Sequence, residues 1–298
     1  MILSHDQTGD GAAVLLLHSG VCDRRMWDPQ WKALADAGYR VVRADFRGHG
    51  ETPADFTRPH EASDDVRALL DSLGIERAAL VGSSFGGRVA LETAARYPER
   101  VTALALLCPG LPGHEPSAAL RAFGAEEDAL LEAGDVEAAV ALNVEYWLGP
   151  QATPETRAAV ADMQRHAFEV QLAAWYAAQA AKAADRPADA GHEAGEAQPA
   201  AAAEAADQAS DETEAEAAPD LSRITVPCLA VGGSQDVADF REIAARLPRI
   251  LPHARHVELD GAGHLPSLEL PTQTTGLLLD FLGSEDCRRR ATTGAPRN

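Results

Sequence analysis

Short apolar runs alternate with amphipathic stretches along the first third of the chain. The apolar runs have the length of strands and fall at 12–17 (AAVLLL), 39–44 (YRVVRA), 78–81 (AALV) and 101–107 (VTALALL). Stretches with helical spacing of their apolar residues separate them, at 26–37, 61–73 and 85–97. Near-continuous apolar strands that alternate with helices predict an α/β domain whose parallel sheet is covered on both faces.

The pattern changes after Pro109. The segments between 112 and 184 all have helical spacing, and none reads as a strand. Alternation then resumes, with predicted strands at 224–231 and 254–259 and predicted helices at 239–247 and 272–282. We therefore interpret 112–184 as a helical cap inserted into a core formed by 1–111 and 219–285.

Two further segments differ in composition. The stretch 185–218 is mostly Ala with acidic residues, and 185–220 holds eleven Asp and Glu against one Arg, which is half of the chain's formal net charge of −20. The segment has too few large apolar side chains to offset the conformational entropy that it would lose on ordering. We therefore expect 185–218 to be flexible. The polar segment 286–298 is expected to be a disordered tail.

Charge and motif content narrow the class of partner. A net charge of −20 and a pI of about 4.8 argue against nucleic acid and against an anionic membrane surface. No apolar run is long enough to span a bilayer, and the N-terminus lacks a secretory signal pattern. No phosphate-binding loop and no H-E-x-x-H motif occurs. We expect a cytoplasmic protein with a small-molecule substrate, no metal and no cofactor; the sequence does not give the oligomeric state.

The four cysteines are consistent with a cytoplasmic protein that binds no metal. They form no C-x-x-C pair and no zinc-type spacing, and lie at Cys22, Cys108, Cys228 and Cys287. We expect reduced, buried thiols.

The strongest chemical signal is the pentapeptide Gly82-Ser83-Ser84-Phe85-Gly86. An apolar strand runs into it and a helix follows at once, which is the strand–turn–helix context of a G-x-S-x-G nucleophile elbow. Glycines two positions before and after Ser84 remove the Cβ atoms that would crowd the turn. Ser83 would be flanked by Val81 and Phe85, so the spacing selects Ser84 as nucleophile.

A serine hydroxyl needs a base, and the base needs a carboxylate. His264 lies in a Gly-rich loop directly after the last predicted strand. Asp236 follows the strand at 224–231, one strand–helix unit earlier, and is the first candidate for the acid. Asp239 is the alternative, although an N-cap role suits it better.

An oxyanion requires two preorganised donors. We expect one to be the backbone N–H of Phe85. The other should come from the loop after the strand at 12–17, with Gly20 as first candidate and Val21 as second. His18 is expected to be a structural hydrogen-bonding residue.

At this point the chain resembles the α/β-hydrolase fold family, in its esterase, lactonase and cofactor-free peroxidase-like branch. The matching segments are LLLHSG at 15–20, ADFRGHGET at 44–52, VGSSFGGRVALETAARYPERVTALALLCPG at 81–110, VPCLAVGGSQD at 226–236 and DGAGHLPSLELP at 260–271. The resemblance implies a doubly wound, mostly parallel sheet with a helical cap and a shortened antiparallel first strand, expected at 2–5. It also implies a structural role for the loop motif at Asp45, Arg47, Gly48 and His49.

The resemblance implies hydrolysis of a small carboxylic ester or lactone through an acyl-enzyme. Ser at the nucleophile position disfavours the haloalkane dehalogenase and epoxide hydrolase branches, which use Asp. His-Ser-Gly replaces the commoner His-Gly-x, which puts the geometry of the oxyanion loop in question. The alternatives are perhydrolysis, C–C bond hydrolysis or lyase chemistry on the same residues, or a member that binds a small molecule without turnover.

Overall fold

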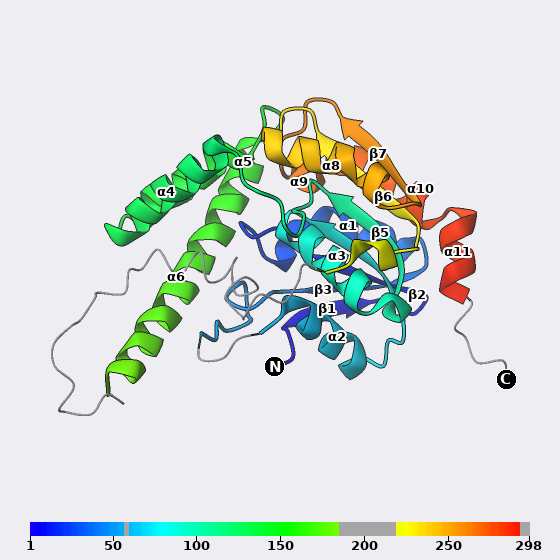
Figure 1. Cartoon of the computed structure of the whole chain (residues 1–298), viewed down its shortest axis with the longest axis horizontal. Helices are drawn as coiled ribbons and strands as arrows, with labels where there is room; N and C mark the ends of the chain where they lie inside the picture. Colours follow the sequence, from blue (N-terminus) through cyan, green and yellow to red (C-terminus); the bar gives the residue numbers. More distant parts are fainter. Residues whose placement is uncertain (57–59, 185–218, 293–298) are drawn as a thin grey trace.

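A seven-stranded sheet forms the centre of the molecule (Figure 1). The computed structural model describes residues 1–56, 60–184 and 219–292. The strands are β1 (His5–Thr8), β2 (Ala12–Leu17), β3 (Tyr39–Ala44), β4 (Ala78–Ser83), β5 (Val101–Leu107), β6 (Cys228–Gly233) and β7 (Ala254–Leu259). Their order is β1-β3-β2-β4-β5-β6-β7, with β1 antiparallel to β3 and all other pairs parallel. The prediction of a mostly parallel α/β sheet is confirmed.

Helices cover both faces of this sheet. They are η1 (Arg24–Trp27), α1 (Asp28–Asp36), α2 (Ala62–Ser72), α3 (Phe85–Arg96), α8 (Ala238–Ile250), α9 (Pro266–Glu269), α10 (Pro271–Leu282) and α11 (Glu285–Thr292). Leu15 and Leu17 of β2 pack in an apolar cluster with α2 and α3, while Val14 and Leu16 pack in a second cluster with α1 and α10. Successive strand residues thus reach opposite cores, which explains why the strands read as unbroken apolar runs.

Among the described residues, three inserted α-helices lie between β5 and the undescribed segment that begins at residue 185. They are α4 (Ala118–Glu132), α5 (Val136–Trp147) and α6 (Pro154–Ala184), and they lie together beside the sheet (Figure 1). Phe168 and Val140 belong to a small apolar cluster that joins them. Helix α4 begins at Ala118, where the Ser117 hydroxyl caps it by accepting from the Leu120 N–H at 3.2 Å. The segment 185–218, expected to be flexible, lies outside the described residues.

The first strand is displaced from its expected position. It spans His5–Thr8 rather than 2–5, and His5 lies opposite Ala44 of β3. Gly9, at φ +74°, makes the turn that leads from β1 towards β2. A Cβ at Gly9 would lie 2.1 Å from the Tyr39 carbonyl oxygen, so only glycine lets the chain pass this close to β3.

The expectation of a disordered tail from 286 is wrong for the residues up to 292, which form α11. Cys287 is only 4% exposed and packs in the apolar cluster of the α1–α10 face. The guanidinium of Arg77 donates to the Arg290 carbonyl at 3.3 Å. A single buried side chain in a polar sequence anchors this helix, which composition alone does not reveal. Residues 293–298 lie outside the described residues.

The cysteine expectation holds, since all four cysteines are free and buried. Among the helices of the described residues, none has both the length and the apolar character that a bilayer crossing requires. A cytoplasmic location stays a prediction.

We predict that Cys287→Asn lowers the free energy of unfolding by roughly 1–3 kcal/mol, because it places an unpaired amide among apolar side chains. Urea unfolding followed by circular dichroism measures the change. Asp286→Asn, at the neighbouring exposed position, is the control and should stay within about 0.5 kcal/mol of the parent. Equal stabilities of the two variants would mean that α11 is not anchored.

Candidate active site

Ser84 lies at the junction of β4 and α3, in a backbone conformation that L-residues rarely adopt. Its φ is 51° and its ψ is −114°. The Ser84 N–H donates to the Leu107 carbonyl at 2.9 Å, and the Ser84 carbonyl accepts from the N–H groups of Arg88 and Gly110, both at 3.0 Å. Three hydrogen bonds therefore hold the strained turn, which is the kind of strain found at functional sites.

Gly82 and Gly86, on either side of Ser84, are required because a Cβ at either position would clash with a backbone carbonyl oxygen. A Cβ at Gly82 would lie 2.2 Å from the Gly86 carbonyl oxygen, and a Cβ at Gly86 would lie 2.3 Å from the Leu17 carbonyl oxygen. The Gly86 N–H donates to the His18 carbonyl at 3.1 Å. The start of α3 is thus held against the end of β2, which brings the predicted oxyanion loop beside Ser84.

The structure brings Ser84, His264 and Asp236 together. The His264 Nε2 lies 2.7 Å from the Ser84 Oγ, and its Nδ1 lies 2.9 and 3.1 Å from the two carboxylate oxygens of Asp236. Asp236 follows β6 and His264 follows β7, so both come from the carboxyl ends of strands near β4. The arrangement has the connectivity that nucleophilic catalysis by serine requires.

Glu269 organises the His264 loop and was missed in the sequence. Its buried carboxylate accepts from the N–H groups of Gly263 and Gly149 at 2.9 Å and of Leu265 at 3.0 Å. Burial raises the pKa of Glu269, and these three donors oppose the rise. Glu269 thereby fixes the backbone on both sides of His264 and ties it to the end of α5. The one sequence signal was a lone acidic residue in the otherwise apolar stretch after His264.

The alternative acid, Asp239, lies in the first turn of α8 and serves another purpose. Its Oδ1 accepts from the Ser117 N–H at 2.7 Å and lies 3.0 Å from the His114 Nε2. These contacts lower the pKa of Asp239 against the opposing effect of its burial. Asp239 thus holds the segment that leads into α4. It is not the cap of its own helix, because the N-cap position is Val237.

Cys108 lies beneath the Asp236–His264 pair. Its φ is 44°, and its Sγ lies 3.7 Å from the Gly263 carbonyl oxygen. The ligand atoms of Cys108, Asp236 and His264 all lie within 4.8 Å of one another, the one potential metal cluster among the described residues. Burial raises the pKa of the Cys108 thiol, so the thiol stays protonated. Because Asp236 and His264 already bond to each other, this donor set suits hydrogen bonding better than metal binding.

The oxyanion candidates line the same cavity as Ser84. Within the described residues, no hydrogen bond occupies the N–H groups of Phe85, Gly20 or Val21. The Gly20 carbonyl lies 2.9 Å from the His49 Nε2, and this contact sets the orientation of the peptide between Gly20 and Val21. Burial lowers the pKa of His49, so its imidazole is neutral. The geometry leaves Gly20 and Val21 both open as the second donor.

His18 is structural, as the sequence suggested. Its Nε2 accepts from the Phe46 N–H at 2.9 Å, so the tautomer carries its proton on Nδ1, which donates to the Ser19 carbonyl at 2.8 Å. Complete burial is the main reason that the pKa of His18 falls to about 3. A neutral His18 thus joins the loop after β2 to the loop after β3.

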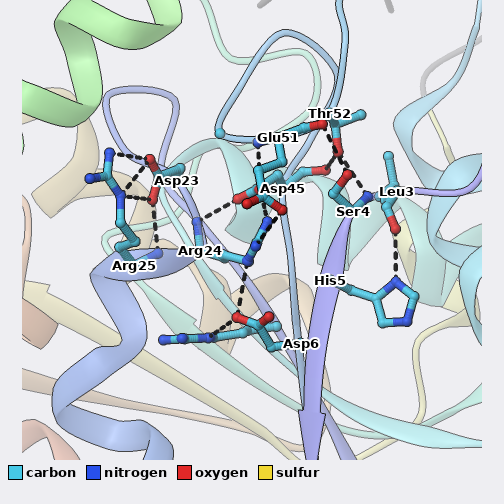
Figure 2. A network of polar contacts seen from close by, with 12 residues as sticks. Leu3, Ser4, His5, Asp6, Asp23, Arg24, Arg25, Asp45, Glu51 and Thr52 are labelled. Carbon is cyan, nitrogen blue, oxygen red and sulfur yellow. Dashed lines mark hydrogen bonds and ion pairs between the residues drawn. The ribbon is translucent and has the colours of Figure 1, made fainter.

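A network of charged side chains also joins the loop after β2 to the loop after β3 (Figure 2). The carboxylate of Asp45 accepts from the N–H groups of Arg24 and Glu51, at 2.8 and 2.9 Å, and pairs with the Arg24 guanidinium. Arg24 also binds Asp6 and Glu51. Charged residues here line a cavity of about 470 Å³, but they bond largely to one another, so we assign the network a structural role.

The cavity at Ser84 has a volume of about 650 Å³, within the usual range for small-molecule sites. Its walls come from the core and from the inserted helices. Of the aromatic residues on these helices, Phe123, Trp147 and Phe168 line the cavity. Tyr146 stacks on Phe123 at 4.0 Å, while Trp175 packs against Phe56. The ring of Trp147 lies 4.5 Å from that of His264, so an inserted helix shields the imidazole.

We predict that the protein loses stability in acid through His18. The unfolded chain binds a proton at a pKa near 6.5 and the folded chain only near 3, so the free energy of unfolding falls as pH drops through this window. One such group gives a slope of up to ~1.4 kcal/mol per pH unit. Urea unfolding from pH 7 to 4 measures this slope. His18→Gln should make the slope shallower, and part of it should remain because burial also lowers the pKa of His49. Parallel slopes for the variant and the parent would contradict the assignment.

Comparisons with known proteins agree with this architecture. Residues 12–271 match the family model described as alpha/beta hydrolase fold. The 2-hydroxy-6-oxo-6-phenylhexa-2,4-dienoate hydrolase of Comamonas testosteroni is 37% identical over 115 residues, which are 37% of this chain and 40% of that protein. The chain is therefore matched to only about two fifths of that relative's length.

Solved structures resemble the chain over nearly its whole length. The enol-lactonase from Burkholderia xenovorans LB400 has a TM-score of 0.71 and 23% identity, with 95% of this chain and 96% of that chain covered. A hydrolase from Pseudomonas aeruginosa PA01 has a TM-score of 0.69 and 26% identity, with 95% and 94% covered. With a family match that extends from β2 to the start of α10, the chain belongs to the alpha/beta hydrolase fold family.

Proposed function

We propose that the enzyme hydrolyses a small carboxylic ester or lactone through an acyl-enzyme intermediate on Ser84. The observation that carries this proposal is the unbroken hydrogen-bonded chain from Asp236 through His264 to the Ser84 hydroxyl. Each side chain is a residue type suited to its position in that chain. The hydroxyl at its end lines a cavity that can hold a substrate.

The proposed reaction has two steps. Ser84 Oγ attacks the substrate carbonyl carbon while His264 Nε2 takes the hydroxyl proton. Asp236 accepts a hydrogen bond from the His264 Nδ1–H and so stabilises the imidazolium. The N–H groups of Phe85 and Gly20 are proposed to bind the oxyanion. The leaving alkoxide takes the proton from His264, and a water activated by the same imidazole then hydrolyses the acyl-enzyme. For a lactone the alkoxide remains attached, so the product is a hydroxy acid.

The inserted helices are proposed to act as a cap over this chemistry. Trp147 and Phe240 pack on the His264 ring with centroid distances of 4.5 and 4.3 Å. The His264 N–H donates to the Trp147 carbonyl at 2.9 Å. Burial of the His264 imidazole strengthens its electrostatic contacts in the site, because fewer water dipoles screen them. The net charge of −20 supports a small molecule rather than nucleic acid as the partner.

C–C bond hydrolysis is the second candidate. The relative from Comamonas testosteroni, named a 2-hydroxy-6-oxo-6-phenylhexa-2,4-dienoate hydrolase, favours it over the part of the chain that it matches. The same hydroxyl and imidazole could serve that reaction. A panel with short-chain aryl esters, a γ-lactone and a vinylogous 1,5-diketone separates the two candidates by their relative kcat/KM.

We predict that Ser84→Ala removes turnover of 4-nitrophenyl butyrate, with at most a residual of ~10³–10⁴-fold over water. A fluorophosphonate probe followed by peptide mass spectrometry should label the parent at Ser84 and leave the variant unlabelled.

Ser83→Ala is the matched control. The Ser83 hydroxyl is buried and finds no hydrogen-bond partner within the described residues, so its removal should spare both labelling and turnover. Labelling that is lost in Ser83→Ala but kept in Ser84→Ala would move the nucleophile to the neighbouring residue. A parent that no probe labels would favour binding without turnover.

We predict that Asp236→Asn lowers kcat by ~10⁴-fold, because an amide favours the wrong imidazole tautomer. Asp239→Asn should stay within about tenfold, because it weakens only contacts to the segment before α4, each worth ~1 kcal/mol. Steady-state kinetics on 4-nitrophenyl butyrate measures both. A collapse of kcat in Asp239→Asn alone would reverse the assignment of the acid.

A further inference from the structure

Cys108 is one of two non-glycine residues with a positive φ in the described part of the chain, and the other is Ser84. It directly follows β5, the strand beside β4, and has φ 44°. The Cys108 N–H donates to the Val231 carbonyl of β6 at 2.7 Å, which holds the backbone in this conformation. Strained residues of this kind persist only where the surrounding structure holds them, and they concentrate at functional sites.

The Cys108 side chain contacts the loop that carries His264. Its thiol is fully buried and donates to the Gly263 carbonyl, with 3.7 Å between sulfur and oxygen. Among the described residues, no other hydrogen bond reaches this carbonyl. A Cβ at Gly233 would lie 2.1 Å from the same oxygen, so the end of β6 packs closely against it. A buried carbonyl needs a donor, because an unpaired one loses its hydrogen bonds to water without replacement.

The thiol therefore helps to fix the peptide group between Gly263 and His264. The carbonyl of this peptide accepts from Cys108, and its N–H, which belongs to His264, donates to the Trp147 carbonyl at 2.9 Å. Both polar groups of the peptide are thus bonded, and to two different parts of the fold. Because a peptide group is planar, these two bonds fix the orientation of the plane that contains the His264 Cα. From there the His264 Nε2 lies 2.7 Å from the Ser84 Oγ.

The thiol stays available as a donor because it does not ionise. Burial is the main reason that the pKa of Cys108 rises, and the negative charge of Asp236 adds to the rise. The sulfur lies within 4.8 Å of a carboxylate oxygen of Asp236 and of a ring nitrogen of His264. A thiolate at this place would repel that carboxylate and the Gly263 carbonyl, whereas the protonated thiol bonds to the carbonyl.

We propose that Cys108 is a positioning residue for the base. Its hydrogen bond to the Gly263 carbonyl holds the peptide that leads into His264, so that the imidazole stays aligned with the Ser84 hydroxyl. This inference rests on the proposal that Ser84 and His264 carry out the hydrolysis. Cys108 is not among the residues that line the cavity, so it acts through His264 and not on the substrate. Because the same imidazole serves both steps of the proposed reaction, its displacement should lower kcat and leave KM nearly unchanged.

Three substitutions at position 108 separate the hydrogen bond from the packing and the backbone strain. Cys108→Ala removes the donor and should lower kcat on 4-nitrophenyl butyrate by about 3- to 10-fold, the effect of one neutral hydrogen bond. Cys108→Ser keeps a donor in the same place and should restore kcat to within about twofold of the parent. Cys108→Gly lacks the donor but adopts a positive φ without strain, so it should lose kcat as Cys108→Ala does. Steady-state kinetics gives kcat and KM for each variant.

Cys228→Ala is the matched control. Cys228 is 1% exposed and packs in the apolar cluster with α2 and α3. It begins β6, at the end of the strand away from Asp236. Its substitution removes a buried sulfur of the same kind at a distance from the His264 loop, so it should lower stability while kcat stays within about twofold of the parent.

A proton NMR signal gives a readout that does not need turnover. The His264 Nδ1–H is bonded to Asp236 and the residue is 1% exposed, so this proton should give a downfield signal that exchanges slowly with water. Cys108→Ala should shift or broaden the signal, and Cys108→Ser should restore it. Cys228→Ala should leave it as in the parent.

The outcomes separate this proposal from the hydrolytic one. An unchanged kcat in Cys108→Ala and Cys108→Gly, a loss that Cys108→Ser shares in full, or equal losses in Cys108→Ala and Cys228→Ala would each overturn the positioning role. A parent that neither turns over the ester nor labels with the fluorophosphonate probe would contradict hydrolysis instead. In that case the NMR signal alone decides the role of Cys108: a change in Cys108→Ala that Cys108→Ser reverses supports it, and an unchanged signal overturns it.

Discussion

The geometry of the candidate site depends on the left-handed turn at Ser84. The residue has φ 51°, a conformation that costs roughly 1–3 kcal/mol, and hydrogen bonds to Leu107, Arg88 and Gly110 hold it there. The direction of the hydroxyl is therefore set by the backbone. Because the turn is rigid, only the loop that carries His264, 180 residues later in the chain, has to adopt the correct conformation. In that conformation the His264 Nε2 lies 2.7 Å from the Ser84 hydroxyl.

The parallel sheet supplies the remaining geometry, and this part could be read from the sequence. Strands that are buried on both faces give unbroken apolar runs, so β2, β3 and β5 were predicted at their observed residues. The first strand and α11 were not. Each depends on one local feature, the Gly9 turn and the burial of Cys287, which a periodic pattern does not contain.

The candidate site shows the same division. Ser84 has a motif whose spacing reflects steric necessity, and chain order selected Asp236 and His264. Glu269 bonds only to backbone N–H groups, which every sequence offers, so its one signal is that it is a lone acidic residue in an apolar stretch. Gly20 and Val21 could not be separated, because their difference lies in the orientation of one peptide.

The inserted helices and the chemistry belong to one bonded structure. Glu269 accepts from Gly149 at the end of α5, and the His264 N–H donates to Trp147 on α5, so the base loop is built partly from the insertion. On the opposite side, Gln171 of α6 contacts Gly48, next to the His49 that orients Gly20. The loops that carry His264 and Gly20 therefore cannot shift without disturbing a contact to a helix of the insertion. For this reason the proposed cap and the two proposed catalytic loops form one connected unit.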